Sequence, residues 1–213
     1  RKLRELLHCC QFVQSHAISF FHLSSPDLLL GMDSDPVKRN IVGVLEKFPE
    51  LARSGILLRK FGQQAIERLA KERIHPSWTV PGGVNAPLSR EDRDAILSEL
   101  PAAKAIIRHT LQFFKGAIGG FEQEIQSFGS APTMHAGLAD AEGDLQIYDG
   151  QLRFRDANGN LAATLEKPAD YQNFIGEAVV PHSYLKAPFF KPLGYPQGIY
   201  RVGPLARLSA AGP

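Results

Sequence analysis

The sequence predicts a mainly α-helical protein of the α+β class that also contains a small antiparallel β element. Apolar residues recur at the 3.6-residue period of a helix through most of residues 1–128, whereas residues 144–166 alternate between apolar and polar side chains. Residues 180–213 are rich in proline, which favours extended chain and turns. We therefore expect a single domain with a helical part at 1–128, a β meander at 144–166 and an extended segment at 180–213.

Length and composition are typical of a globular chain. With 213 residues, 44% of them hydrophobic, the chain is long enough to bury a substantial core. Its 24 basic and 22 acidic residues are spread along the sequence, which argues against a nucleic-acid-binding protein. No apolar run reaches the roughly 18 residues of a membrane span. The two cysteines, Cys9 and Cys10, are adjacent and exclude a disulfide framework, so we expect a reducing, cytoplasmic location.

Two helices are expected before residue 49. Residues 1–24 carry an apolar stripe at helical spacing, and Pro26 is expected to end it. The chain begins inside this stripe with no capping residue before it, so we expect a fragment of a longer polypeptide. Asp35 is expected to cap a second helix with Pro36 at its first position, the place that suits proline best.

Two more helical regions follow. Pro49 opens a helix that runs to about residue 72 despite Gly55 and Gly62. Ser89, with Asp92 three residues later, approximates a capping box for a helix that begins at Arg90. Pro101 is expected to interrupt this helix, and a longer one is expected at 102–128. Its three glycines suggest that a neighbouring helix approaches closely there; they are Gly116, Gly119 and Gly120.

Between these helical regions, residues 74–84 form a loop whose shape is strongly restricted. Each of its two prolines holds φ near about −65°, while Gly82 and Gly83 permit positive φ. Such a loop is rigid, whether it is only a turn between helices or also has a function. In the second half, Asp149-Gly150 and Asn158-Gly159 supply turns for the meander, and a short helix is expected at 170–179.

No self-contained active site is evident. The seven histidines form no HExxH or comparable metal-binding pattern, and there is no phosphate loop, dinucleotide fingerprint or CxxC pair. A single histidine on a helix is more often a hydrogen-bonded structural residue than a ligand. Cys9 and Cys10 have the wrong spacing for a metal site.

Five segments, in order, resemble motifs of nickel-iron hydrogenase large subunits. They are Gln14 to Asp27 (QSHAISFFHLSSPD), Asp35 to Asn40 (DPVKRN), Leu58 to Gln63 (LRKFGQ) followed by the loop at 74–84, Ser183 to Pro188 (SYLKAP), and Gly203 to Arg207 (GPLAR). The chain is similar to the branch that couples hydrogen to NAD or NADP, with F420-linked relatives nearby. One position departs from the pattern, because members commonly have histidine where this chain has Ser19.

The resemblance implies a catalytic large subunit that oxidises H2 reversibly and passes electrons through iron-sulfur clusters to NAD(P). It implies a nickel-iron centre, with cyanide and carbon monoxide on iron, held by two CxxC motifs outside these 213 residues. We therefore expect the fragment alone to hold no metal and to be inactive. The implied partners are an iron-sulfur small subunit together with a diaphorase module that contains flavin. An alternative is a non-catalytic scaffold related to the complex I subunit of this fold, and a stand-alone binding module is a third reading.

Three residues acquire expected roles from the resemblance. Asp27 matches an aspartate that lies over the metal centre and pairs with an arginine from a later segment. The alternative from local sequence is an aspartate that caps a helix after Pro26. His75 matches a loop histidine that faces the small subunit near the electron exit, and its alternative is a histidine bonded to the loop backbone. His16 matches a helical Ser-His pair and is expected no closer than the second layer around the metal.

Overall fold

The computed structural model describes residues 1–212 and has the α+β fold that the sequence predicts. It divides into two compact units, residues 1–128 and a second unit that begins at Gly129. The buried side chains fall into separate clusters. Two clusters lie among the helices of the first unit, and one lies within the second. None of the described helices is long and apolar enough to span a bilayer.

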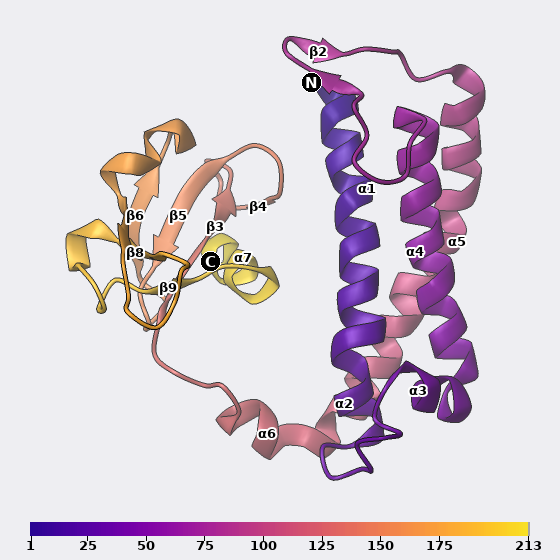
Figure 1. Cartoon of the computed structure of the whole chain (residues 1–213), viewed down its shortest axis with the longest axis horizontal. Coiled ribbons are helices and arrows are strands. Elements are labelled where there is room, and N and C mark those ends of the chain that lie inside the picture. The colour runs from indigo at the N-terminus through magenta and orange to yellow at the C-terminus, as the bar shows by residue number, and fades with distance from the viewer. Residues whose placement is uncertain (213) are drawn as a thin grey trace. The chain divides into compact units, whose positions relative to one another are not determined.

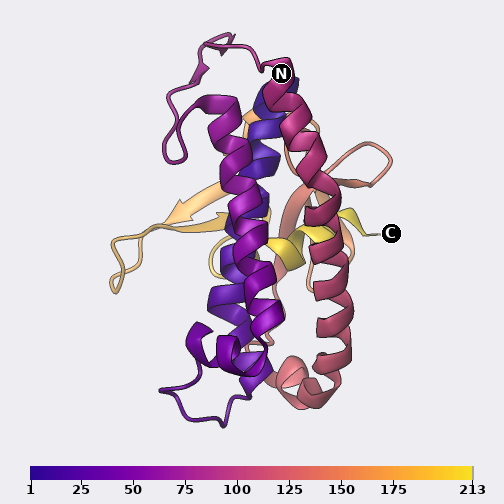
Figure 2. The ribbon, with the colours of Figure 1, turned by 90° about the vertical axis from the view of Figure 1, so that its right-hand side faces the viewer.

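Three long helices lie side by side in the first unit (Figures 1 and 2). They are α1 (Lys2–Ile18), α4 (Pro49–Ala70) and α5 (Arg90–Ala117). Helix α4 packs against both of the others, and it buries a stripe that includes Leu51, Leu58 and Leu69. Its start at Pro49 and its apolar period are as predicted, since proline at the first turn costs no hydrogen bond.

Close packing on α4 depends on two glycines, Gly62 against α1 and Gly55 against the turn that follows α1. A Cβ atom added at Gly62 would lie 2.9 Å from the backbone nitrogen of Gln14, and one at Gly55 would lie 2.4 Å from Cγ of Phe21. Such distances leave no room for a methyl group. At Gly116 an added Cβ would meet nothing within 4 Å, and the same holds at Gly119 and Gly120, so the predicted close approach at those three positions is wrong.

The chain does not leave the helical path at Pro26, contrary to the prediction. After α1 it forms a π-helical turn, Ser19–Ser24, and then α2, Ser25–Leu30. The backbone N–H of Ser25 donates to the carbonyl of Phe20, one residue further back than in an α-helix. This wider turn precedes the proline, which has no N–H to satisfy and whose ring would crowd a carbonyl in a regular helix. Helical backbone therefore continues to Leu30.

The next helix begins later than predicted. Helix α3 spans Ile41–Lys47, and the side chain of Asn40 caps it by accepting from the N–H groups of Val42 and Gly43. Asp35 instead accepts from the N–H of Val37 in a turn. Aspartate and asparagine satisfy turns and helix starts by the same hydrogen bond, so local sequence does not distinguish them.

Helix α5 continues through Pro101, which was predicted to interrupt it. Pro101 is exposed, so water can satisfy the carbonyl that its missing N–H would have bonded. Packing of the buried face then keeps the helix continuous. The predicted helix at 102–128 ends early: α5 stops at Ala117, a 3₁₀ turn covers Ile118–Phe121, and α6 spans Glu122–Ser127.

The second unit contains a five-stranded sheet and a short hairpin. In the sheet, β3 lies between β4 and β5, β6 pairs with β5, and β9 runs parallel to β3. The strands are β3 (Met134–Ala139), β4 (Leu145–Gln146), β5 (Gln151–Arg155), β6 (Leu161–Leu165) and β9 (Tyr200–Arg201); the hairpin is β7 (Ile175–Ala178) with β8 (Ala187–Phe190). The antiparallel strands expected at 144–166 are thus present and β5 pairs directly with β6, but β4 and β5 are separated by β3, a strand that was not predicted.

Two expectations for the second half are wrong in detail. The helix predicted at 170–179 is a 3₁₀ turn, Pro168–Asn173, followed by β7. The segment expected to be extended contains a second 3₁₀ turn, Lys191–Leu193, and helix α7, Pro204–Ala211. Helix α7 packs on β3 so closely that a Cβ at Gly137 would lie 2.9 Å from that of Ala210. Strand β3 contains small residues because α7 packs closely on it. It therefore lacks the β-branched side chains that would indicate a strand in the sequence.

Candidate functional site

Asp27 forms an ion pair with Arg39. The carboxylate extends from the first turn of α2, and its Oδ1 lies 3.1 Å from Nε of Arg39. The guanidinium also donates to the carbonyl of Met32. The Asp27 side chain is 46% exposed and that of Arg39 is 26% exposed, so the pair lies at the surface of the first unit. Arg39 thereby joins α2 to the turns that follow it.

This geometry excludes the capping alternative for Asp27 and leaves its proposed role near a metal centre a prediction. Ser24 occupies the N-cap position of α2, and Asp27 lies within the helix. Its carboxylate pairs with a guanidinium and does not cap the helix. The resemblance implied an arginine from a later segment as the partner, and Arg39 follows Asp27 in the same unit, beyond the turns at residues 31–40.

The loop at 74–84 has a defined shape because its middle is anchored in the core. Strands β1 (Thr79–Val80) and β2 (Gly83–Val84) form a hairpin around Pro81 and Gly82. Trp78 is only 2% exposed, and its indole Nε1 donates to the carbonyl of Ala86 at 2.8 Å. The rigid loop that the sequence predicted is therefore held by a buried aromatic side chain as well as by its prolines and glycines.

His75 lies on this loop in an unusual backbone conformation. Its φ is +50°, and Lys71 is the other non-glycine residue of the described chain with positive φ. The residue before a proline is also restricted to extended conformations, so His75 is strained on two counts. The residue is exposed.

The three predicted site residues do not meet in one place. His16 is exposed in the last turn of α1, where its ring stacks on Phe12 at a centroid distance of 5.1 Å. Asp27 follows beyond that end of α1. The loop that carries His75 packs at the other end, because Val84 joins the same apolar cluster as Leu3. A helix of this length is about 25 Å long, so Asp27 and His75 belong to opposite ends of the bundle.

The residues present do not fit a nickel-iron centre. Within residues 1–212, no three His, Cys, Asp or Glu side chains gather as a metal site requires. Burial raises the pKa of the Cys10 thiol to about 11, and burial followed by the charge of Glu5 raises the pKa of Cys9. The two cysteines are adjacent on α1, and no group of three potential ligands within residues 1–212 includes them, so they form no nickel site there.

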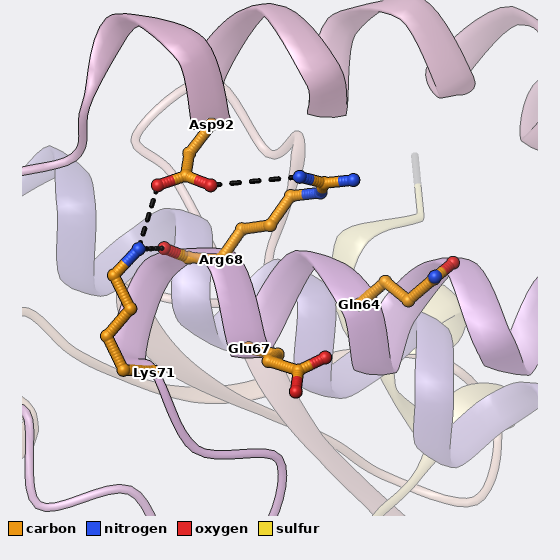
Figure 3. A pocket seen from close by; sticks show the side chains of 5 residues that line it. All are labelled: Gln64, Glu67, Arg68, Lys71 and Asp92. Atoms are coloured by element: carbon orange, nitrogen blue, oxygen red, sulfur yellow. Dashed lines mark hydrogen bonds and ion pairs between the residues drawn. The ribbon is translucent and has the colours of Figure 1, made fainter.

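A polar cluster that the sequence did not indicate joins the end of α4 to the start of α5. Asp92 Oδ2 lies 2.8 Å from Nζ of Lys71, and Oδ1 lies 3.7 Å from Arg68 (Figure 3). The same carboxylate accepts from the hydroxyl of Ser89 at 2.8 Å, while that hydroxyl accepts from the N–H of Asp92 in the predicted N-cap. The hydrogen bond from Lys71, and then that from Ser89, lowers the pKa of Asp92. A hollow of about 390 Å³ borders this cluster.

The chain is similar to subunits of known hydrogenases, although no family model matches it. It is 41% identical over 209 residues to a subunit of the F420-non-reducing hydrogenase vhu of Methanocaldococcus jannaschii, covering 98% of this chain and 50% of that protein. It is 34% identical over 214 residues to the beta subunit of the NAD-reducing hydrogenase HoxS of Cupriavidus necator, covering 98% and 44%. The chain thus spans about half the length of these relatives.

A solved structure agrees with these sequence relationships. A chain in the crystal structure of an NAD+-reducing [NiFe]-hydrogenase in its H2-reduced state superposes with a TM-score of 0.92 and 43% identity. The match covers 97% of this chain and 46% of that one. At this identity both the fold and the ancestry are shared. The homologues of this chain are therefore subunits of F420-non-reducing and NAD-reducing hydrogenases.

Proposed function

We propose that this chain is the central part of the catalytic large subunit of a nickel-iron hydrogenase. In the intact subunit the reaction is the reversible conversion of H2 into two protons and two electrons. The observation that carries the proposal is the match to the NAD+-reducing [NiFe]-hydrogenase structure, at 43% identity over 97% of the chain. The order of the five sequence motifs supports the same conclusion independently of the fold.

The electrons are proposed to leave through the iron-sulfur clusters of a small subunit, from which they reach a flavin and NAD(P) in a diaphorase module. Two electrons and one proton convert NAD+ into NADH, which balances the oxidation of one H2 with release of one proton. The NAD-reducing name of one relative supports this acceptor. The F420-non-reducing relatives support a hydrogenase but name no acceptor.

In this proposal the nickel-iron centre is held by cysteines outside these 213 residues, because the residues described do not fit it. This chain supplies the helical walls of the subunit. Asp27, held by Arg39, is proposed to contribute negative charge near the outer face of the site. His75, exposed on its anchored loop, is proposed to lie near the electron exit, and His16 to act only through other groups.

The decisive experiment uses the parent polypeptide together with its partner subunits. H2-dependent reduction of NAD+ and one nickel per purified subunit would support the proposal. A parent sequence lacking either CxxC, or a purified complex without nickel and without H2 oxidation, would refute it in favour of a non-catalytic scaffold. Stoichiometric nickel on the 213-residue chain alone would show that the ligands had been assigned to the wrong region.

A further inference from the structure

Both positive-φ residues that are not glycine in the described chain belong to one connection, the segment 71–89 between α4 and α5. Lys71 has φ +63° at the C-terminus of α4, and His75 has φ +50° directly before Pro76. Each conformation costs free energy for a residue with a side chain, and such strain persists only where surrounding contacts maintain it. Some contact must therefore hold this connection in place at its α4 end.

The polar cluster at Asp92 provides that contact. Because Lys71 is left-handed at the helix end, its Nζ reaches both the carbonyl of Arg68, at 3.2 Å, and the carboxylate of Asp92, at 2.8 Å (Figure 3). Arg68 lies 3.7 Å from the other carboxylate oxygen and 3.5 Å from Glu99. The side chain of Asp92 is only 18% exposed, so this carboxylate is more shielded than those of the surface ion pairs elsewhere in the unit.

The cluster joins the two ends of the segment 71–89. Arg68 belongs to the last turn of α4 and Lys71 is its C-cap residue, while Asp92 belongs to the first turn of α5. Between these ends the segment is held at its middle by Trp78, whose indole bonds to Ala86. No described contact of the cluster reaches His75 itself.

We propose that Lys71, Arg68 and Asp92 form a latch that maintains the strained conformation of His75. The latch fixes where the chain leaves α4 and where it enters α5, while Trp78 fixes the middle. The five residues from Lys71 to His75 must then span a set distance, and the left-handed conformation of His75 completes that path. The latch residues position His75 without touching it. Only the role of His75 in electron exit depends on the proposed function; the latch itself depends on these contacts alone.

Hydrogen–deuterium exchange in the parent polypeptide, followed by mass spectrometry, tests the latch. In Asp92→Asn the peptides that cover residues 76–88 are expected to exchange about fivefold faster than in the wild type, as the loss of a shielded ion pair allows. Peptides of α4, residues 49–70, are expected to be unchanged. Glu91→Gln, a change in the same helical turn at an exposed residue outside the cluster, is the matched control and leaves both regions unchanged.

Two combined variants separate a latch from a general loss of stability. Lys71→Met with Asp92→Asn should exchange no faster than Asp92→Asn alone, because Asp92→Asn already removes the ion pair with Lys71. Adding His75→Gly to Asp92→Asn should restore slow exchange, since glycine adopts positive φ without strain. Unchanged exchange in Asp92→Asn, equal acceleration in α4, additive effects of the two latch changes, or no rescue by glycine would each overturn the proposal.

The same preparations keep this proposal separate from the proposed function. H2-dependent reduction of NAD+ is measured on the wild-type complex alongside the exchange. A complex that shows the expected exchange pattern but does not oxidise H2 refutes the hydrogenase proposal and leaves the latch standing. A complex that oxidises H2 while Asp92→Asn leaves the exchange unchanged refutes the latch only.

Discussion

Nε of Arg39 lies 3.1 Å from Oδ1 of Asp27, and the same guanidinium donates to the carbonyl of Met32. Arg39 thus contacts both the Asp27 carboxylate and the backbone of the turns that follow α2. Because the acidic side chain is nearly half exposed, the pair serves orientation more than stability. The ion pair holds the Asp27 carboxylate in one orientation.

Replacing Asp27 by asparagine is expected to slow H2 oxidation by the intact enzyme on the order of tenfold, because a neutral amide no longer supplies charge where charge develops in the reaction. Nickel and iron content should be unchanged, since Asp27 is no ligand. Turnover and metal analysis on the same preparation check both points. Asp35→Asn, at an exposed aspartate in the following turns, is the control. Equal turnover in wild type and Asp27→Asn would make Asp27 structural.

Replacing Arg39 by methionine is expected to lower the free energy of unfolding by about 1 kcal/mol, since a partly exposed ion pair and one hydrogen bond to a carbonyl are lost. Urea denaturation monitored by circular dichroism measures the change. Arg53→Met is the matched control, because that side chain is 70% exposed and lies 3.9 Å from Glu50. Combined with Asp27→Asn, the loss should be smaller than the sum of the two single losses. Strict additivity would show that the ion pair contributes nothing.

Two glycine-to-alanine changes are predicted to have opposite effects, one in the contact between α1 and α4 and one at an open position of α5. Gly62→Ala should destabilise the chain by about 1–3 kcal/mol, because its methyl group would meet the backbone of α1 at Gln14. Gly116→Ala should stabilise it by roughly 0.5–1 kcal/mol, because alanine favours a helix and the space there is open. Thermal unfolding of both variants tests the prediction. A stabilising Gly62→Ala would show that the two helices can separate at little cost.

The buried thiol of Cys10 predicts a loss of stability in alkali. In the unfolded chain this thiol ionises near its ordinary pKa of 9.0, whereas burial raises the pKa in the folded chain to about 11. Between these values the unfolded chain has released a proton that the folded chain retains, so stability falls as pH rises from about 9 to 11. Linkage puts the loss at about 2 kcal/mol.

Cys10→Ala removes this contribution, so the difference in unfolding free energy between wild type and variant should change by that amount across the same pH range. Urea titrations at closely spaced pH values measure it. Lysines and tyrosines also titrate in this pH range, but their contribution is the same in both proteins and cancels in the difference between wild type and Cys10→Ala. A difference that stays constant from pH 8 to 11 would show that the thiol is accessible to water in the folded chain.

Elements whose signals lie within a few neighbouring residues were predicted correctly. Pro49 and the apolar period after it define α4, and Ser89 caps α5 with the expected bond to Asp92. The turn around Gly159 joins the paired strands β5 and β6, as predicted. Predictions failed where packing outweighed a local signal. Pro101 interrupts no helix because the α5 backbone is held by its buried face, and β3 forms from small residues because α7 covers it.

The residues of the candidate site were likewise predicted in part from the sequence. Motif order along the chain singled out Asp27, His16 and His75, and it indicated a hydrogenase subunit; the relatives, which are subunits of hydrogenases, agree with this interpretation. The roles of these three residues remain predictions. The sequence did not indicate which arginine pairs with Asp27, since no rule of spacing links it to Arg39.

By itself, therefore, the sequence determined the α+β class, the main helices, the rigid loop and the kinship with hydrogenases, because each of these is written in residues that are neighbours in the chain or in motifs of fixed order. Only the tertiary structure decided that Arg39 holds Asp27, that Lys71 meets Asp92 and that Asp27 and His75 lie at opposite ends of a bundle. These relationships join residues far apart in sequence, and packing of whole helices, rather than any local preference, sets the distances between them.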